Sequence, residues 1–140
     1  MAQSNCDRVR RMLKGPYAGV GATDESLQSL MKELGFTLPE DYLEFMRQTN
    51  GYTGEVGTSG FVCIWPVEEV LPINEANHFR ESVPGLVLFG SNEGGETYAF
   101  DVRGHHPKVV MVPTIPLDLE YAVEVGGSFV DFLENLARPS

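Results

Sequence analysis

Apolar residues recur along the chain with two spacings, one typical of helices and one typical of strands. The clearest helical run, with apolar positions at i, i+3, i+4 and i+7, consists of Leu27, Leu30, Met31 and Leu34. Thr23 is a suitable N-cap before this run, and Gly35 is a suitable stop after it. The pattern therefore predicts a helix over residues 24–34.

Three further helices are predicted around this one. A short helix spans Asp7 to Lys14. The next begins with Pro39 at its first helical position and closes at Asn50–Gly51, so it should form a hairpin with the helix at 24–34. The last helix follows Ser128, whose hydroxyl can cap it in a capping-box pattern.

Extended patterns dominate the second half of the chain. Before them, glycines at positions 51, 54, 57 and 60 predict a flexible loop over residues 51–60. The apolar run Phe61–Trp65 predicts a mostly buried strand that Pro66 ends, and residues 68–71 and 74–80 are expected to form short helical turns. The remaining strands are predicted near residues 86–90, 97–101, 108–112 and 119–125.

The order of these elements predicts the fold class. Helices come first, then strands, then one helix, which favours an α+β fold over a doubly wound α/β fold. We expect a single domain with a largely antiparallel central sheet, flanked by the N-terminal helices and a C-terminal helix. This domain is placed at residues 23–140, after an N-terminal extension at residues 1–22.

The turn between the strands at 86–90 and 97–101 is rich in glycine, and such turns can bind phosphate through their backbone amides. This turn also carries Glu93 and Glu96, whose negative charges oppose phosphate. A β-hairpin with an acidic tip is the better interpretation. It indicates binding rather than nucleotide chemistry.

Charge narrows the class of partner. The chain has a net charge of −10, and residues 23–140 alone hold nineteen acidic against six basic residues. Such a surface repels nucleic acid and anionic membranes and attracts basic partners, although the charge could also serve solubility alone. The basic residues near the N-terminus, Arg8, Arg10, Arg11 and Lys14, form too short a cluster to indicate nucleic-acid binding.

Cysteine usage and hydropathy indicate the compartment. Cys6 and Cys63 are too few and too widely spaced for a disulfide framework or a zinc site. No apolar run approaches the roughly 20 residues that span a bilayer, and the N-terminus lacks the apolar stretch of a secretory signal. We therefore expect a cytoplasmic protein.

The sequence offers no strong catalytic or metal-binding pattern, so no metal or cofactor is predicted. The adjacent pair His105–His106 points to opposite faces of an extended segment, and His78 and Asp101 could join it only through tertiary proximity. Glu93 and Glu96 could form an acid–base pair, but a Gly-Gly turn fixes carboxylates poorly.

Nucleophilic catalysis is also disfavoured. Cys63 lies within an apolar strand, where a thiol is usually packed and inert. The segment Gly57–Gly60 lacks the strand-to-helix elbow of a serine hydrolase. Trp65, the sole tryptophan, and Tyr52 could each belong to the core or serve as a binding anchor.

Several motifs, taken in order, resemble the SUKH superfamily, also described as the Smi/Knr-like domain. The resemblance covers Thr23 to Ala137. The matching pieces are Leu38–Tyr42 with Phe45, then Asn50–Gly51, Phe89–Gly90, Gly94–Asp101 and Ser128–Leu133. The resemblance implies an α+β fold and no enzymatic activity.

It also implies a function, because many bacterial members of the superfamily bind and neutralise a cognate toxin, often a nuclease. Our leading hypothesis is an immunity protein that binds a basic toxin domain. A cytoplasmic scaffold or regulator of the same fold, as the yeast cell-wall synthesis regulator suggests, is the alternative, followed by a small hydrolase that uses Glu93 and Glu96. We expect the partner to contact Tyr52, Glu55, Trp65, Glu93, Glu96 and Asp101.

Overall fold

The computed structural model describes residues 5–13, 15, 20–58 and 60–138. Its helices are α1 (Asn5–Met12), α2 (Asp24–Leu34), α3 (Glu40–Gln48), α4 (Val67–Ala76), α5 (Phe79–Ser82), the 3₁₀ helix η1 (Leu119–Tyr121) and α6 (Phe129–Ala137). Its strands are β1 (Tyr52–Val56), β2 (Gly60–Ile64), β3 (Leu86–Ser91), β4 (Glu96–Asp101), β5 (Lys108–Pro113) and β6 (Val123–Gly126).

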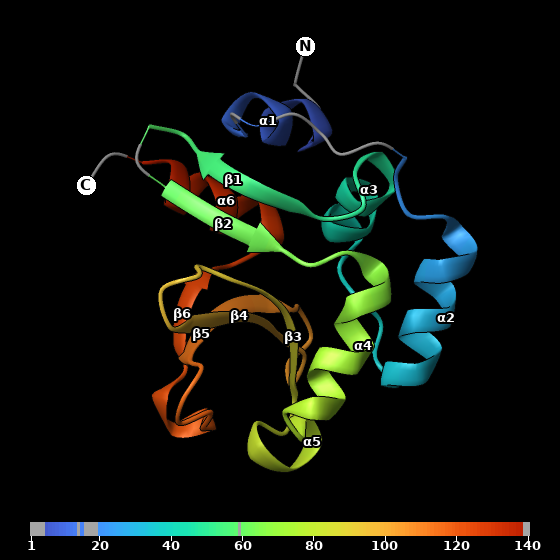
Figure 1. The fold of residues 1–140 in the computed structure, drawn as a ribbon, viewed down its shortest axis with the longest axis vertical. Helices are drawn as coiled ribbons and strands as arrows, with labels where there is room; N and C mark the ends of the chain where they lie inside the picture. Colours follow the sequence, from blue (N-terminus) through green and yellow to red (C-terminus); the bar gives the residue numbers. More distant parts are fainter. Residues whose placement is uncertain (1–4, 14, 16–19, 59, 139–140) are drawn as a thin grey trace.

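The strands form one six-stranded sheet in which neighbours follow one another in chain order (Figure 1). Every pair of neighbouring strands is antiparallel. The helix α6 packs against β6, β5, β1 and β2, while α4 and α5 pack against β3. This arrangement confirms the predicted α+β fold with an antiparallel sheet.

An aromatic cluster joins the sheet to α3 and α6. Phe89 of β3 and Phe100 of β4 stack with their ring centroids 4.3 Å apart. Tyr42 of α3 lies 5.0 Å from Phe100 and 5.4 Å from Phe129 of α6, both edge to face. All four rings are fully buried, so the cluster is the centre of the core.

The predicted helix caps are confirmed. The Ser26 N–H donates to the Thr23 hydroxyl at the start of α2, and Gly35 ends α2 with a left-handed φ of 81°. The Asp131 N–H donates to the Ser128 hydroxyl at the start of α6. Pro39 differs from expectation, because it lies at the N-cap of α3 rather than at its first helical position.

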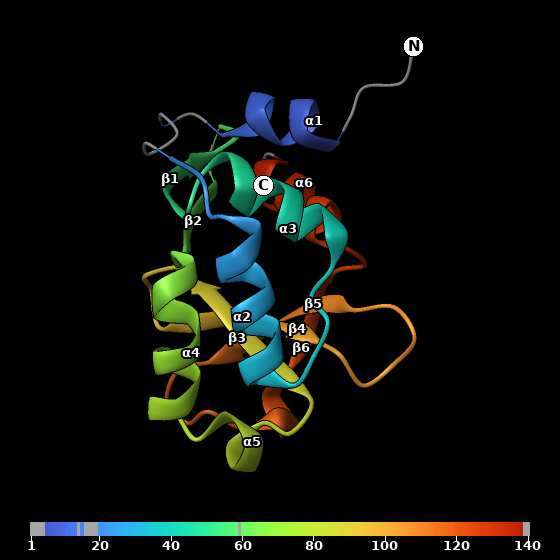
Figure 2. The same ribbon diagram turned by 90° about the vertical axis from the view of Figure 1, so that its right-hand side faces the viewer.

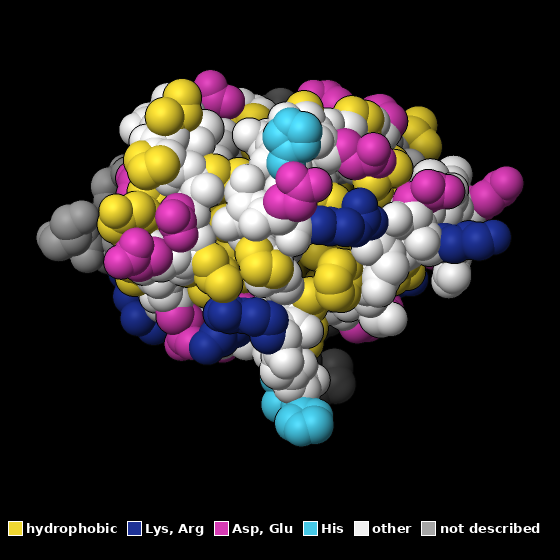
Figure 3. Space-filling view, turned by 90° about the horizontal axis from the view of Figure 1, so that it is seen from below, with side chains coloured by type: hydrophobic (Ala, Val, Ile, Leu, Met, Phe, Trp, Pro, Cys, Tyr) yellow, Lys and Arg dark blue, Asp and Glu magenta, His cyan; other side chains and the backbone are white. Residues whose placement is uncertain are grey.

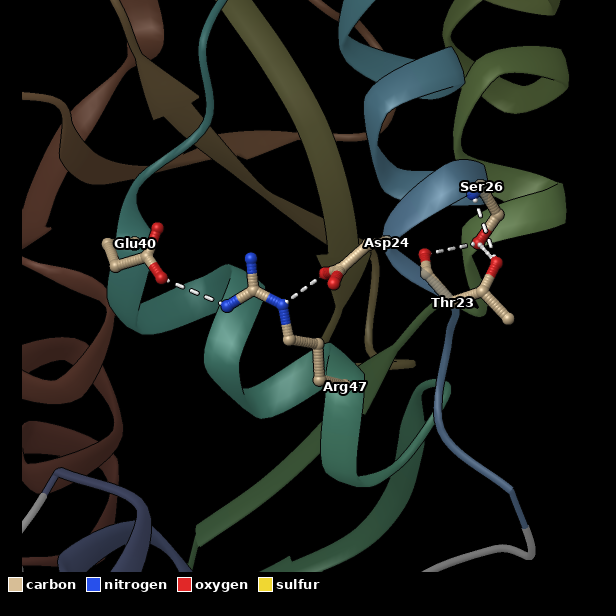
Figure 4. A network of polar contacts seen from close by, with 5 residues as sticks. All are labelled: Thr23, Asp24, Ser26, Glu40 and Arg47. Carbon is tan, nitrogen blue, oxygen red and sulfur yellow. Dashed lines mark hydrogen bonds and ion pairs between the residues drawn. The ribbon is translucent and has the colours of Figure 1, made fainter.

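A network of charged side chains joins the start of α2 to α3 (Figure 4). Arg47 donates to Asp24 over 2.6 Å and to Glu40 over 2.9 Å, and all three side chains are exposed. Along its length, however, α2 lies beside α4 (Figure 2). The helical hairpin predicted around Gly35 is therefore not the main packing of α2.

The prediction of a flexible loop over residues 51–60 is wrong. Tyr52–Val56 and Gly60–Ile64 pair as the hairpin β1–β2, with the residues Tyr52 and Ile64 opposite each other. Gly57 has a φ of 64° in the turn, and a side chain there would meet the backbone of Ala137 in α6. The glycines therefore permit the turn and its close contact with α6.

Two further segments differ from expectation. The helical turns predicted at 68–71 and 74–80 are instead one ten-residue helix, α4, which continues through Pro72, followed by α5. The strand predicted over 119–125 begins as η1, and only Val123–Gly126 is extended and paired with β5. The predicted strands at 86–90, 97–101 and 108–112 are confirmed.

The side chain of Asn74 in α4 occupies the edge of β3. The strand β2 pairs with β3 only at Cys63–Ser91 and Ile64–Gly90. Beyond these pairs, the Leu88 N–H donates to Asn74 Oδ1 and Asn74 Nδ2 donates to the Leu88 carbonyl, both over 2.8 Å. Asn74 therefore satisfies the backbone groups of β3 that β2 leaves free.

The helix α1 packs on α3 and α6 and reaches the free edge of β1. Val9 and Leu13 are buried, Leu13 forms an isolated bridge with Val56, and the Gly57 N–H donates to the Met12 carbonyl over 2.7 Å. The short helix predicted at 7–14 is thus present two residues earlier. The last residue of that prediction, Lys14, lies outside the described residues.

Candidate functional site

A pocket with a volume of about 480 Å³ opens beside the tip of the β3–β4 hairpin. It lies between the C-terminal half of α4, the turn after β3 and the loop that follows β5. Its lining consists of Trp65, Ile73, Asn77, Leu88, Ser91, Glu93, Gly95, Glu96, Thr97, Thr114, Ile115 and Leu117. Three of the six residues predicted to contact a partner, Trp65, Glu93 and Glu96, therefore line one site.

Trp65 follows directly after β2 and is half-buried. Its N–H donates to the Phe89 carbonyl over 3.1 Å, which fixes the backbone of Trp65 beside β3. The chain then turns into α4, with Pro66 at the N-cap. The sole tryptophan is thus held at the junction of sheet and helix, where it lines the pocket.

Glu93 is exposed at the tip of the hairpin and has a left-handed φ of 62°. This conformation costs a residue other than glycine roughly 1 kcal/mol. Its carboxylate lies near Cys63 of β2. The pKa of the Cys63 thiol is raised, chiefly by burial and also by the Glu93 carboxylate. The hydrogen bond from the hydroxyl of Thr53 opposes this shift but does not cancel it. The half-buried thiol therefore stays protonated at neutral pH.

Glu96 begins β4 and is held by Asn92 on the other side of the turn. Asn92 Nδ2 donates to Glu96 Oε1 over 2.9 Å, and the N–H groups of Gly94 and Glu96 both donate to Asn92 Oδ1. The Asn92 side chain thus closes the turn and orients the carboxylate. Glu96 is better fixed than the Gly-Gly sequence suggests.

The other three predicted contact residues lie apart from the pocket. Tyr52 is buried, accepting from the Gly15 N–H over 2.7 Å and donating to the Glu55 carbonyl over 2.8 Å. Asp101 is also buried and accepts two hydrogen bonds from the guanidinium of Arg103. Both residues have structural roles. Glu55 is exposed on β1, opposite Phe61.

The apolar walls of the pocket could not be predicted from the sequence. Ile73 and Leu88 come from α4 and β3, while Ile115 and Leu117 come from the loop after β5. Only Ile115 carries a sequence signal, as an apolar residue between Thr114 and Pro116 in a turn-like segment. Its side chain is 90% exposed.

The surface next to the pocket is apolar and acidic. Figure 3 shows hydrophobic side chains gathered at the left, where the segment that runs through η1 to β6 lies, with acidic side chains among them. Ile115, Tyr121 and Val123 are at least half exposed there. The neighbouring acidic residues are Asp118, Glu120 and Glu124, all exposed.

Among the described residues, the histidines do not lie beside other potential metal ligands. His105 and His106 are exposed in the turn between β4 and β5, and His78 is exposed before α5. Within the described ranges, no three His, Cys, Asp or Glu side chains lie close enough to hold a metal ion. Among the same residues, no helix is long and apolar enough to cross a membrane.

An antiparallel six-stranded sheet, covered by helices and bearing a pocket at one hairpin tip, defines a small α+β domain. The sequence model of the SMI1/KNR4 family (SUKH-1) matches residues 21–135 of this chain. The chain therefore belongs to the SMI1/KNR4 family, and the resemblance to the SUKH superfamily is confirmed. No curated protein matches the chain significantly.

Proposed function

We propose that this protein is a non-enzymatic, cytoplasmic protein-binding domain that binds and neutralises a basic toxin domain. The observation that carries the proposal is the pocket that joins Trp65, Glu93 and Glu96 beside an exposed apolar surface. Aromatic anchors surrounded by a polar rim are typical of binding interfaces. Membership of the SMI1/KNR4 family supports a binding or regulatory role.

The charge of the chain favours a basic partner. The net charge is −10, and Glu93 and Glu96 lie at the rim of the pocket. A nuclease toxin has to present basic groups to phosphate, and an acidic protein can cover those groups and be steered towards them. The contact surface we propose is the pocket together with Ile115, Tyr121 and Val123.

Coexpression tests this function. Each protein encoded beside the gene for this chain is expressed in a bacterial host with and without the chain, as a candidate toxin. The proposal expects growth arrest without the chain and restored growth with it. If both proteins are present and growth does not return, a scaffold or regulator of the same fold becomes the better account.

Association kinetics test the electrostatic part of the proposal. We expect the association rate constant of the purified pair to fall by at least about tenfold between low and high ionic strength. An association rate constant that is independent of salt would contradict steering by the acidic surface. If the protein has a hydrolytic activity and the double substitution Glu93→Gln/Glu96→Gln abolishes it, the alternative of a small hydrolase would instead be favoured.

A further inference from the structure

We propose that the pocket takes an arginine side chain of the partner protein, with the guanidinium against the indole of Trp65 and paired with Glu93 and Glu96. This inference rests on the proposed function and specifies the group that the site recognises. It follows from three properties of the pocket. These are the negative charge of Glu93 and Glu96, the aromatic side chain of Trp65 and the apolar side chains of its walls.

The charge of the pocket is uncompensated. None of the residues that line it is basic, and among the described residues neither Glu93 nor Glu96 lies within ion-pair distance of a Lys or Arg. Among the described residues, the only hydrogen-bond donor to the Glu96 carboxylate is the neutral side-chain amide of Asn92. The two carboxylates therefore favour a cation supplied from outside.

The aromatic wall distinguishes arginine from lysine. A guanidinium is planar, stacks on an aromatic face and is more weakly hydrated than an ammonium group. It can also donate two parallel hydrogen bonds to a carboxylate. Trp65 supplies the aromatic side chain that lines the pocket, and Glu96, held by Asn92, supplies an oriented carboxylate.

The walls suit the aliphatic part of the same side chain. Ile73, Leu88 and Leu117 line the pocket, and Ile115 is exposed at its side. The methylene groups of arginine pack well on such apolar surface while the charged end remains near polar groups. A short acidic or purely apolar side chain would use only part of this lining.

The sole tryptophan provides a direct test, because all indole fluorescence comes from Trp65. Capped Gly-Arg-Gly is titrated against the full chain, beside capped Gly-citrulline-Gly and Gly-Lys-Gly of the same length. We expect the arginine peptide to change the emission saturably, with a dissociation constant of about 1 mM. The lysine peptide should bind more weakly, and the citrulline peptide at least about tenfold more weakly.

Matched charge variants locate the site. The double variant Glu93→Gln/Glu96→Gln should bind the arginine peptide at least about tenfold more weakly. The control Glu25→Gln/Glu75→Gln removes the same charge from exposed positions outside the pocket and should change binding less than about twofold. Circular dichroism of both variants confirms that they are folded.

The outcomes separate this inference from the proposed function. Equal binding of the arginine and citrulline peptides, absence of saturable binding, or equal binding by the two double variants would overturn the arginine site. Toxin neutralisation that survives Glu93→Gln/Glu96→Gln would also overturn it and leave the proposed function intact. Arginine binding without any toxin neutralisation would overturn only the function.

Discussion

The side-chain amide of Asn74 pairs with the backbone of Leu88 as a neighbouring strand would. Each of the two hydrogen bonds is 2.8 Å long, and Asn74 Nδ2 also donates to the Val70 carbonyl over 2.7 Å. The Asn74 side chain is fully buried. One amide therefore attaches α4 to β3 where β2 has already turned away.

We predict that Asn74→Ala lowers the free energy of unfolding by about 2–4 kcal/mol, because it leaves the N–H and carbonyl of Leu88 buried without partners. Urea denaturation followed by circular dichroism measures this loss. Asn77→Ala is the matched control, since Asn77 is only half-buried and donates to one helical carbonyl. Equal losses in the two variants would contradict the role given to Asn74.

The hydroxyl of Tyr42 is buried in the aromatic cluster without a hydrogen-bond partner among the described residues. Burial also raises the pKa of this phenol. We predict that Tyr42→Phe raises the free energy of unfolding by about 1 kcal/mol, because it removes a desolvated polar group without creating a cavity. Thermal denaturation measures the change, and a lower melting temperature would contradict the prediction.

Tyr52 provides the opposite case for the same substitution. Its hydroxyl accepts from the Gly15 N–H and donates to the Glu55 carbonyl. We predict that Tyr52→Phe lowers the free energy of unfolding by about 1–2 kcal/mol, because two backbone groups lose their partner. The same thermal denaturation measures it. A melting temperature of Tyr52→Phe equal to or above that of the wild type would argue against a structural role for this hydroxyl.

The N-cap at Thr23 and the two ion pairs of Arg47, all drawn in Figure 4, should differ in their contribution to stability. We predict that Thr23→Ala lowers the free energy of unfolding by about 1 kcal/mol, because the N-cap of α2 is lost. Arg47→Ala should lower the free energy of unfolding by less than Thr23→Ala does, because ion pairs between exposed side chains contribute little to stability. Denaturation at low and high salt distinguishes the two, since only the second loss should depend on salt.

Acid should weaken the contact between Asp101 and Arg103. The hydrogen bond from the Arg103 side chain holds the pKa of the Asp101 carboxyl below its usual value of 3.8. A carboxyl whose pKa is lower in the folded than in the unfolded state stabilises the fold at pH values above the unfolded-state pKa. This stabilisation is lost as the pH falls through the folded-state pKa. The stability difference between the wild type and Asp101→Asn should therefore shrink below about pH 4, and a constant difference would contradict this prediction.

Much of the fold could be predicted because local signals agree with it. Thr23 and Gly35 mark the ends of α2, and the acidic turn marks the β3–β4 hairpin. The hairpin β1–β2 could not be predicted, because its glycines are typical of a loop. Strand pairing and the burial of Tyr52 and Val56 overcome the low strand propensity of glycine there.

The full length of the helix α4 and the pocket could not be predicted from the sequence, because both depend on contacts between residues that are distant in the chain. The two short turns are predicted on either side of Pro72, but packing on α2 and the contact of Asn74 with Leu88 hold one helix through this proline. The pocket gathers Trp65, Glu93 and the loop after β5, which are distant in the chain. Its acidic rim could be predicted, whereas its walls depend on tertiary packing alone.

The helix α1 has a practical consequence for anyone who prepares this protein. The part of the chain that matches the family begins at residue 21, after α1. A fragment cut there would lose Val9 and Leu13 from the core and would leave the edge of β1 near Val56 open. Open strand edges pair with other copies, so the solubility of recombinant material depends on residues that lie outside the family boundary.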